Sequence, residues 1–410
     1  MRTIHTDTRE DNQGNSPIPR RAFLAGAAAA SAFTVLRPAT VFGAEANAKI
    51  DLGLIGCGGR GHWIAKLFGE TGLYRFVACA DYFQDRADRV GDEFGIAPAR
   101  RFTGLAGYRR LLEGKLDAVV IETPPCFHPI QAADAVDARV HVFLAKPIAV
   151  DVPGCLIVAD AGKRATAKKL VFLVDFQTRA NDLYREAQRR VRHGDLGKLV
   201  MAEAHYPWAG GGRNLPPNEP EARLRQWYGV LPLSGDFIVE QAIHALDVAT
   251  WVLDADPVRA LGLGGQKLRP QGSIWDHFAV NYVFPDDVVL SFTCIQTIPE
   301  MKDEIVCRVF GSEGYLYTDY FSNVWIRGNE PFKGGNVGNL YTTGAQTNIR
   351  EFHQFIVEGR YENPTVPSSV RSNLTAILGR EAGYRHGELT WAALLKEAKQ
   401  LEPDLRGLQA

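Results

Sequence analysis

Cysteine pairs at close spacing are missing from this sequence. None of its six cysteines lies in a C-x-x-C motif or at a metal-ligand spacing from histidine. Such pairs are typical of zinc sites and disulfide frameworks, so we predict no metal site and expect free thiols in a reduced fold. The six are Cys57, Cys79, Cys126, Cys155, Cys294 and Cys307.

An excess of basic charge is missing too. The 410 residues include 46 Lys and Arg against 47 Asp and Glu, which gives a formal net charge of -1. Net charge therefore indicates neither nucleic acid nor an anionic membrane surface as a partner. Beyond the N-terminal segment, no run approaches the roughly 20 apolar residues of a membrane span. We predict a small-molecule ligand and no stable membrane insertion once a signal peptide is removed.

The first 48 residues differ from the rest of the chain. The stretch PRRAFL (residues 19–24) precedes an alanine-rich run, and Ala44, Ala46 and Ala48 offer small-residue cleavage positions. Paired arginines before an apolar run resemble the twin-arginine export signal, which sends folded proteins across the bacterial inner membrane. We predict a signal peptide over residues 1–48, export by the twin-arginine machinery and a periplasmic or other extracytoplasmic location. A disordered N-terminal tail is the alternative.

A glycine-rich turn follows the first apolar run after this segment. Residues 50–56 (IDLGLIG) predict a short strand, and Gly56, Gly58 and Gly61 fit the spacing G-x-G-x-x-G. The first glycine allows a tight turn, the second lets the backbone approach a pyrophosphate, and the third packs the next helix on the strand. Helical periodicity follows, so the phosphates are expected at a helix N-terminus. The predicted cofactor contacts here are Gly56, Gly58, Gly59, Arg60 and Gly61.

An acidic residue stands at the end of the second predicted strand. Asp81 lies roughly 20 residues past the glycines, where a carboxylate binds the ribose diol of NAD. The same carboxylate repels the 2′-phosphate of NADP, so NAD is the expected cofactor. NADP is the alternative, because the side chain of Arg86 lies close enough in sequence to turn toward that phosphate.

Apolar strands alternate with amphipathic helices up to about residue 180. This alternation predicts right-handed βαβ units and a parallel sheet. Beyond it, runs such as 279–284 and 288–294 are separated by turn signals, which predicts a mostly antiparallel sheet. We expect an α/β fold with a Rossmann domain over 49–178, an α+β substrate domain with an open sheet over 179–395, and a C-terminal tail over 396–410.

Several motifs follow one another in a characteristic order. The stretch DAVVIETP (residues 117–124) precedes His128 and then HVFLAKP (residues 141–147). Further motifs are GDLG (194–197), GSEG (311–314) and LGREA (378–382). From Lys49 to about residue 395, they resemble the glucose-fructose oxidoreductase, inositol dehydrogenase and rhizopine-catabolism (Gfo/Idh/MocA) family.

The resemblance implies a Rossmann domain joined to a substrate domain whose open sheet often mediates dimers or tetramers. It implies oxidation of a hydroxyl of a sugar, glycoside or cyclitol with NAD or NADP. Some relatives are glycosidases that use the nucleotide transiently. It also places Thr123, Pro124 and His128 at the cofactor, His128 as a support for the nucleotide loops.

The resemblance assigns a double role to Lys146. The family's Glu-Lys-Pro motif falls on Ala145-Lys146-Pro147, so the lysine is kept and alanine replaces the acid. The family's lysine lies beside the nicotinamide and hydrogen-bonds the reacting hydroxyl, and parallel sheets bind ligands at the carboxyl ends of their strands. Lys146 is therefore expected to contact the cofactor and to be catalytic. A solvated surface lysine is the alternative.

A stripe of polar residues is expected in the second domain. Residues 236–253 (DFIVEQAIHALDVATWVL) have helical periodicity, and Asp236, Glu240, His244 and Asp247 fall on one face. The remaining positions are apolar, so the helix is expected to be buried and its polar groups paired or functional. The family's Asp-x-x-x-His pair falls on Glu240 and His244, which implies His244 as acid/base and Glu240 as the group that orients it and favours its charged form. Satisfied core polar groups are the alternative, and Asp247 is expected to be such a support.

These residues predict hydride transfer from a carbon bearing a hydroxyl to the nicotinamide. His244 takes the hydroxyl proton and Lys146 stabilises the developing oxyanion. The alternative is a redox-assisted glycosidase or lyase, in which oxidation acidifies the neighbouring C–H, a leaving group is eliminated and the hydride returns. A nucleotide-binding sensor is disfavoured, because both residues are kept. An exported enzyme has no free NAD pool, so we also predict a tightly bound, recycled cofactor that is loaded before export.

Overall fold

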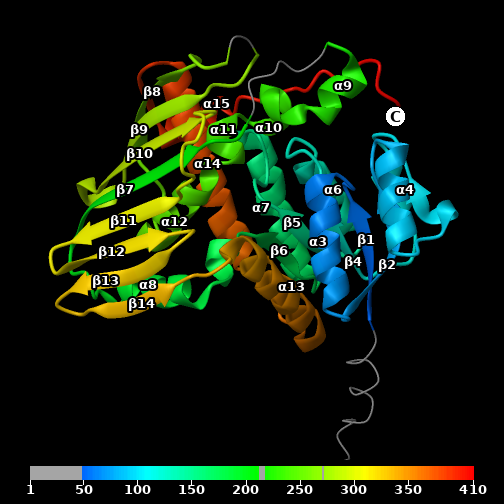
Figure 1. Ribbon diagram of the computed structural model, residues 1–410, viewed down its shortest axis with the longest axis horizontal. Coiled ribbons are helices and arrows are strands. Elements are labelled where there is room, and N and C mark those ends of the chain that lie inside the picture. Colours follow the sequence, from blue (N-terminus) through cyan, green and yellow to red (C-terminus); the bar gives the residue numbers. More distant parts are fainter. Residues whose placement is uncertain (1–48, 212–217, 270–271) are drawn as a thin grey trace, which may run out of the picture. The chain divides into compact units, whose positions relative to one another are not determined.

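Two β-sheets organise the chain between Lys49 and Ala410 (Figure 1). The computed structural model describes residues 49–211, 218–269 and 272–410. The predicted signal peptide over residues 1–48 lies outside these described residues, and the structure says nothing about export.

The first sheet has six parallel strands in the order β3-β2-β1-β4-β5-β6. Both of its faces are covered, which explains why the central strands are almost continuously apolar. The strand order reverses between β1 and β4, and a crevice for ligands forms at such a point. The parallel Rossmann-type sheet confirms the first half of the predicted fold. Its strands are β1 (Ile50–Ile55), β2 (Tyr74–Ala80), β3 (Arg101–Phe102), β4 (Ala118–Ile121), β5 (His141–Ala145) and β6 (Phe172–Asp175).

Helices cover both faces of this sheet. One face shares an apolar core with α3 (Gly59–Glu70) and α13 (Leu340–Glu358), which lie side by side in Figure 1. The other face packs against α6 (His128–Asp137) and α7 (Val152–Ala167). Helix α13 comes from the predicted second domain, so the chain returns to the first sheet near its C-terminal end. Two further helices, α4 (Gln84–Glu93) and α5 (Gly107–Leu112), follow β2 and β3.

The second sheet has nine strands in the order β14-β13-β12-β11-β7-β10-β9-β8-β15. Neighbouring strands are antiparallel except β10 and β7, which are parallel, so the predicted mostly antiparallel sheet is confirmed. Four strands escaped prediction. Three of them are glycine-rich or very short runs, which carry a weak strand signal: β8 (Arg259–Gly265), β14 (Phe332–Asn336) and β15 (Glu388–Thr390). The fourth is β13 (Asn323–Gly328). The predicted strands are β7 (Leu199–Trp208), β9 (His277–Val283), β10 (Val289–Gln296), β11 (Val306–Gly311) and β12 (Gly314–Asp319).

Three helices attach this sheet to the rest of the chain. Helices α8 (Asp182–His193) and α12 (Ile243–Leu253) pack against one of its faces. Helix α14 (Thr365–Tyr384) contacts β8 and β9 of the second sheet and also β6 and α7 of the first. The long α14 therefore fixes the two sheets to each other through its buried side chains.

The single helix predicted over residues 236–253 is wrong in one respect. A one-turn helix, α11 (Phe237–Glu240), ends before α12 begins at Ile243. Asp236 has a φ of 75° and its carboxylate accepts a hydrogen bond from the Phe237 amide, which starts α11. The interruption at Gln241 and Ala242 could not be predicted, because the polar residues keep spacings of three and four across it.

The end of the chain packs against the first sheet's domain. After α15 (Trp391–Glu397), the Leu401 amide donates to Asp151 Oδ2 at 2.8 Å. The Leu105 amide donates to the Gln409 carbonyl at 3.0 Å, and the Gln409 amide donates to Tyr82 Oη at 3.0 Å. The predicted C-terminal tail is therefore anchored beside the strand ends of the first sheet.

Candidate active site

A cavity opens at the carboxyl ends of β2, β1 and β4. Its empty volume is about 1000 Å³, part of which is open to solvent. Most of the predicted cofactor residues line it, whereas Gly61, His128 and Lys146 do not. The predicted residues in its wall are Gly56, Gly58, Gly59, Arg60, Asp81, Arg86, Thr123 and Pro124.

The glycines of the turn meet two different constraints. A Cβ on Gly61 would lie 1.8 Å from the Gly56 carbonyl oxygen, and a Cβ on Gly56, whose φ is +96°, would lie 2.6 Å from the Glu122 carbonyl carbon. Gly61 lets α3 approach the turn, and Gly56 lets the turn approach the backbone after β4. A Cβ on Gly59 would meet no atom within 4 Å, and one on Gly58 only Arg86 Nη1 at 3.6 Å. The space above them, at the N-terminus of α3, fits the pyrophosphate of a dinucleotide.

Asp81 lies on the side of the cavity where the adenosine ribose is expected. Its Oδ2 accepts a hydrogen bond from the Cys57 amide at 2.7 Å, and its Oδ1 accepts one from the Phe83 amide at 2.9 Å. Burial raises the pKa of Asp81, and each oxygen keeps a further lone pair for a ribose hydroxyl. The Arg86 guanidinium lies 4.8 Å from the ring centroid of Phe83, close to Gly58 and the expected phosphates.

His128 supports the cavity wall from behind. Its Nε2 lies 2.7 Å from the Thr123 carbonyl oxygen and its Nδ1 lies 2.8 Å from the Pro147 carbonyl oxygen. Burial lowers the pKa of His128 to about 4. The imidazole ties the loop after β4 to the loop after β5, and His128 is not among the residues that line the cavity. Thr123 Oγ1 donates to Gln131 Oε1 at 2.6 Å, and the Lys146–Pro147 peptide bond is cis.

Lys146 joins the first sheet to the second domain. Its Nζ donates to the Glu240 carbonyl oxygen at 2.6 Å and lies 3.6 Å from Glu240 Oε1. Burial lowers the pKa of Lys146, and the Glu240 carboxylate partly offsets this effect. Lys146 is therefore a buried ammonium group rather than a solvated surface lysine.

His244 is buried in the same region. Its ring makes edge contacts with Phe176 and Tyr320, with centroids 6.2 and 5.8 Å away. Its Nδ1 has no hydrogen-bond partner within the described residues. Burial lowers the pKa of His244 well below its ordinary value, and the charges of Lys146 and Arg60 lower it further.

The expected partnership of Glu240 with His244 is not what the geometry gives. Among the described residues, Glu240 pairs with Lys146 and makes no hydrogen bond to the imidazole. Because α11 ends at Glu240, the break before α12 separates the two side chains that a continuous helix would stack. His244 is held neutral by burial instead of being favoured in its charged form.

Three neighbouring strand ends carry a row of side chains that the sequence did not reveal. Ile121 pairs with Leu144, so Glu122 and Ala145 come next on adjacent strands, and Ala145 pairs with Asp175. Arg60 crosses this row: its Nε lies 3.4 Å from Glu122 Oε2 and its Nη2 lies 2.5 Å from Asp175 Oδ2. The small side chain of Ala145 therefore separates two carboxylates that share one guanidinium.

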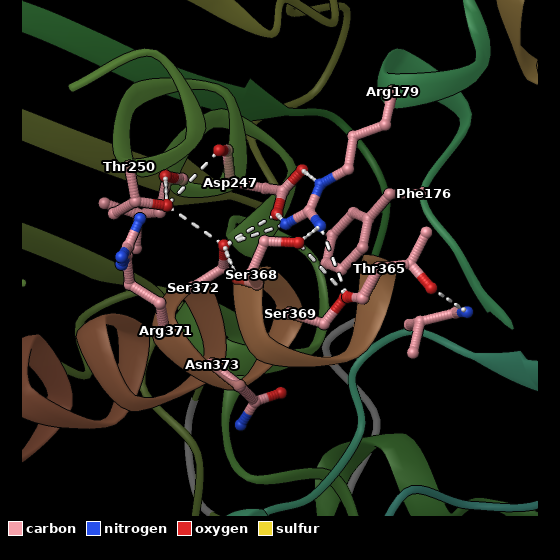
Figure 2. A network of polar contacts seen from close by, with 12 residues as sticks. Phe176, Arg179, Asp247, Thr250, Thr365, Ser368, Ser369, Arg371, Ser372 and Asn373 are labelled. Carbon is pink, nitrogen blue, oxygen red and sulfur yellow. Dashed lines mark hydrogen bonds and ion pairs between the residues drawn. The ribbon is translucent and has the colours of Figure 1, made fainter. Parts of the chain in front are cut away.

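A second buried ion pair fixes the helix that carries His244 (Figure 2). Arg179 donates to both carboxylate oxygens of Asp247, from Nε at 3.0 Å and from Nη2. Ser372 of α14 donates to Asp247 Oδ1 at 2.7 Å. Asp247 is fully paired, as expected of a support. Arg179 is occupied by this network, which gives it a structural role.

Residues of the second domain cover the cavity, and sequence reasoning did not place them there. Leu224, Arg225 and Trp227 line it from α9 (Pro220–Arg225) and the turn after it. The Arg225 guanidinium lies 3.7 Å from the Phe83 ring centroid and pairs with Asp85 at 2.7 Å. No sequence signal placed them at the cofactor cavity, because the contacts depend on how the two domains meet.

Metal sites, membrane-spanning helices and disulfides are three further features that the described residues bear on. No group of three or more His, Cys, Asp or Glu within the described residues is arranged to hold a metal ion. None of the described helices is both long and apolar enough to cross a membrane. All six cysteines are free, and five of them are buried.

The fold and the cavity together define an NAD-binding oxidoreductase of the Rossmann type. Residues 50–174 match the model of an oxidoreductase family with an NAD-binding Rossmann fold, and residues 184–317 match the GFO/IDH/MocA C-terminal domain. The chain belongs to the Gfo/Idh/MocA family, as the order of its motifs predicted.

Individual relatives are distant. The chain is 24% identical over 275 residues to scyllo-inositol 2-dehydrogenase (NAD(+)) of Bacillus subtilis, covering 66% of this chain and 73% of that protein. It is 29% identical over 162 residues to a glycosyl hydrolase family 109 protein of Shewanella woodyi, covering 38% of this chain and 34% of that protein. A levoglucosan dehydrogenase solved with NADH and L-sorbose superimposes with a TM-score of 0.69 at 18% identity, covering 84% of this chain and all of that one. This last likeness confirms the fold.

Proposed function

We propose that this protein oxidises a hydroxyl group of a sugar, glycoside or cyclitol with NAD. The observation that supports this most is the convergence of Lys146 and His244, from two domains, in one buried region beside a nucleotide cavity. Chemistry at a hydroxyl needs a proton acceptor and a donor to the developing oxyanion, and this pair supplies both.

Each residue has a separate task in the proposed reaction. The imidazole of His244 is neutral, so it can take the hydroxyl proton. Lys146 donates a hydrogen bond to the hydroxyl oxygen as negative charge develops there. Glu240 holds the ammonium group in place and limits the fall of its pKa. Bound NAD supplies the hydride acceptor.

The substrate class follows from the family and its relatives. The name of the Bacillus subtilis relative specifies scyllo-inositol, a cyclitol with a ring of secondary hydroxyls. Aromatic side chains near the end of β7 could stack on such a ring: Trp208 and Tyr228 make an edge contact with centroids 5.9 Å apart. We therefore assign a polyhydroxylated ring as the substrate, without choosing the carbon.

We further propose that the cofactor stays bound between turnovers. The cover formed by Leu224, Arg225 and Trp227 lies across the cavity, and the anchored segment around Gln409 meets Tyr82 and Leu105 at its edge. Such a cover slows escape of the nucleotide. This retention agrees with the twin-arginine signal proposed for residues 1–48. An enzyme exported in the folded state with NAD bound could work in the periplasm without a supply of free NAD.

A redox-assisted glycosidase is the second candidate. One observation favours it: the Shewanella woodyi relative is named as a glycosyl hydrolase of family 109, although the likeness covers only 34% of that protein. The same residues would serve it, because the first step is also oxidation of a ring hydroxyl. A retained cofactor suits this reaction, which needs no net oxidant.

We propose that the open face of the second sheet binds another copy of the chain. Half-buried aromatic rings lie along it, with Tyr317 stacked on Trp325 at 5.0 Å between centroids. On β8, the side chains of Leu261 and Leu263 are exposed on the same face. Replacing both leucines by arginine should shift the mass measured by light scattering toward that of a monomer, and an unchanged mass would remove this proposal.

Stoichiometry tests the proposed reaction. Purified enzyme is incubated with scyllo-inositol, with a panel of monosaccharides and with nitrophenyl glycosides, and nucleotide and products are followed by mass spectrometry. A dehydrogenase gives one reduced nucleotide per ketone formed. Glycoside cleavage without net reduced nucleotide identifies the second candidate, and the absence of any product with all probes would contradict both.

A further inference from the structure

Glu122 is a buried carboxyl group with one unused oxygen at the cofactor cavity. It is the first residue after β4, its side chain is 0% exposed, and it lines the cavity. Its Oε2 lies 3.4 Å from Arg60 Nε, at the long end of a hydrogen bond. Its Oε1 is buried and has no partner within the described residues. Buried polar atoms are normally paired, so an unpaired carboxylate oxygen calls for a ligand.

Arg60 alone does not account for this carboxyl group. The guanidinium already has Asp175 as a close counter-ion at 2.5 Å, and Asp175 is itself held by Asn348 Nδ2 at 2.8 Å. Arg60 therefore has two carboxylate partners for one positive charge. Lys146 is the other cation that acts on Glu122, and burial raises the pKa of Glu122 to about 7. Burial thus disfavours the charged form of Glu122, and Arg60 and Lys146 offset this effect only in part.

The position of Glu122 shows which half of the cofactor it would meet. Gly56 to Gly61 receive the pyrophosphate above β1, and Asp81 holds the adenosine ribose on the side of β2. In the order β3-β2-β1-β4-β5-β6, Glu122 lies on the opposite side of β1, toward Lys146 at the end of β5. A dinucleotide that spans the crevice must place its nicotinamide riboside half there. That half offers two kinds of donor, the ribose hydroxyls and the carboxamide N–H groups.

We propose that Glu122 is a positioning residue for the cofactor, whose free carboxyl oxygen accepts a hydrogen bond from the nicotinamide riboside half of NAD. This inference rests on the proposed function only for the identity of the nucleotide. The bond fixes the reactive end of the cofactor next to Lys146. It also explains why Ala145, its neighbour on β5, is small: Glu122 provides the carboxylate at these strand ends, and Arg60 needs the space above Ala145.

Calorimetric titration with three ligands, on protein from which bound nucleotide has been removed, tests this role without using turnover. NAD contains both halves, ADP-ribose lacks the nicotinamide, and ADP lacks the second ribose as well. For Glu122→Ala we expect the affinity for NAD to fall at least about 10-fold, and the affinity for ADP to stay within about 2-fold. ADP-ribose separates the two donors: its affinity falls with that of NAD if a ribose hydroxyl is bound, and is unchanged if the carboxamide is bound.

Two further variants keep the test decisive. Glu122→Gln preserves the shape and one acceptor oxygen, so it should fold if Glu122→Ala does not, and it should weaken NAD binding by a smaller factor. Glu93→Gln removes an acid from α4, away from the cavity, and should leave all three affinities unchanged. Equal losses for ADP and NAD, or no loss for NAD, would overturn the proposal. If the wild-type protein binds NAD but oxidises no sugar, that result would instead count against the proposed function.

Discussion

The ammonium group of Lys146 donates a hydrogen bond to the backbone carbonyl of Glu240 at 2.6 Å, across 94 residues of sequence. This contact joins the end of β5 in the first sheet to α11 in the second domain. The lysine is thereby held beside His244, and the two groups that the proposed reaction needs are buried together before any substrate arrives.

Removing the side chain of Lys146 or of His244 should lower turnover without weakening the binding of NAD. For Lys146→Ala and for His244→Ala we expect kcat to fall by roughly 10² to 10⁴, because each group acts on a proton or a charge that develops in the reaction. The affinity for NAD should change by no more than a few-fold in calorimetry. Lys66→Ala, at an exposed position on α3, is the control and should keep full activity. Normal turnover in either variant would return that residue to a structural role.

The pH profile should report the burial of His244. The neutral imidazole is the base, and its pKa lies well below the ordinary value of 6.5 because burial disfavours its charged form. Protonation therefore begins only at pH values well under 6.5. We expect kcat/KM for the substrate to keep its plateau as the pH falls through 6.5, measured at constant ionic strength and with saturating NAD, so that titration of Glu122 at the cofactor does not enter. An acidic limb centred near 6.5 would show a solvated histidine or another base.

An acid restored at position 145 should destabilise the protein. Ala145 lies between Glu122 and Asp175, and these two carboxylates already share the Arg60 guanidinium. Ala145→Glu adds a third carboxylate, which should lower the free energy of unfolding by about 1 to 3 kcal/mol near neutral pH. Ala145→Gln adds nearly the same volume without charge and is the matched control. Equal denaturation midpoints for the two variants would exclude the electrostatic explanation.

The cover over the cavity should control release of the nucleotide. Arg225 stacks on Phe83 and pairs with Asp85, so Arg225→Ala should raise the dissociation rate of NAD about 3- to 10-fold. Displacement kinetics in a stopped-flow instrument measure this rate directly. Arg189→Ala, on an exposed face of α8, should leave it unchanged. A rate that is the same in both variants would mean that α9 does not retain the cofactor.

The parts of the site that could be predicted from sequence are those set by local constraints. Gly56 and Gly61 serve a tight turn and a close helix, so their spacing alone predicts the cradle. Lys146 follows a recognisable apolar strand and belongs to a motif. The first part of the chain alternates helices with strands, and the second part consists mainly of consecutive strands. This change predicts the fold class without any knowledge of distant contacts.

The parts that escaped prediction depend on which distant segments become neighbours. Glu122 and Asp175 share Arg60 only because β4, β5 and β6 stand side by side, and nothing in the sequence near each residue states that order. The pairing of Glu240 with Lys146 rather than His244 depends on a two-residue break that leaves the helical spacing intact. Arg225 reaches the cavity through the contact between domains.

Transfer of a labelled hydrogen tests the central claim most directly. Purified enzyme with stoichiometric NAD is mixed with scyllo-inositol carrying deuterium on its ring carbons, and with a similarly labelled panel of monosaccharides, and the nucleotide is analysed by mass spectrometry. We expect one deuterium to appear on the nicotinamide with at least one probe in the wild-type protein, and at least about 100-fold more slowly in Lys146→Ala and His244→Ala. Reduced nucleotide without deuterium, or equal transfer in all three proteins, would contradict hydride transfer at this site.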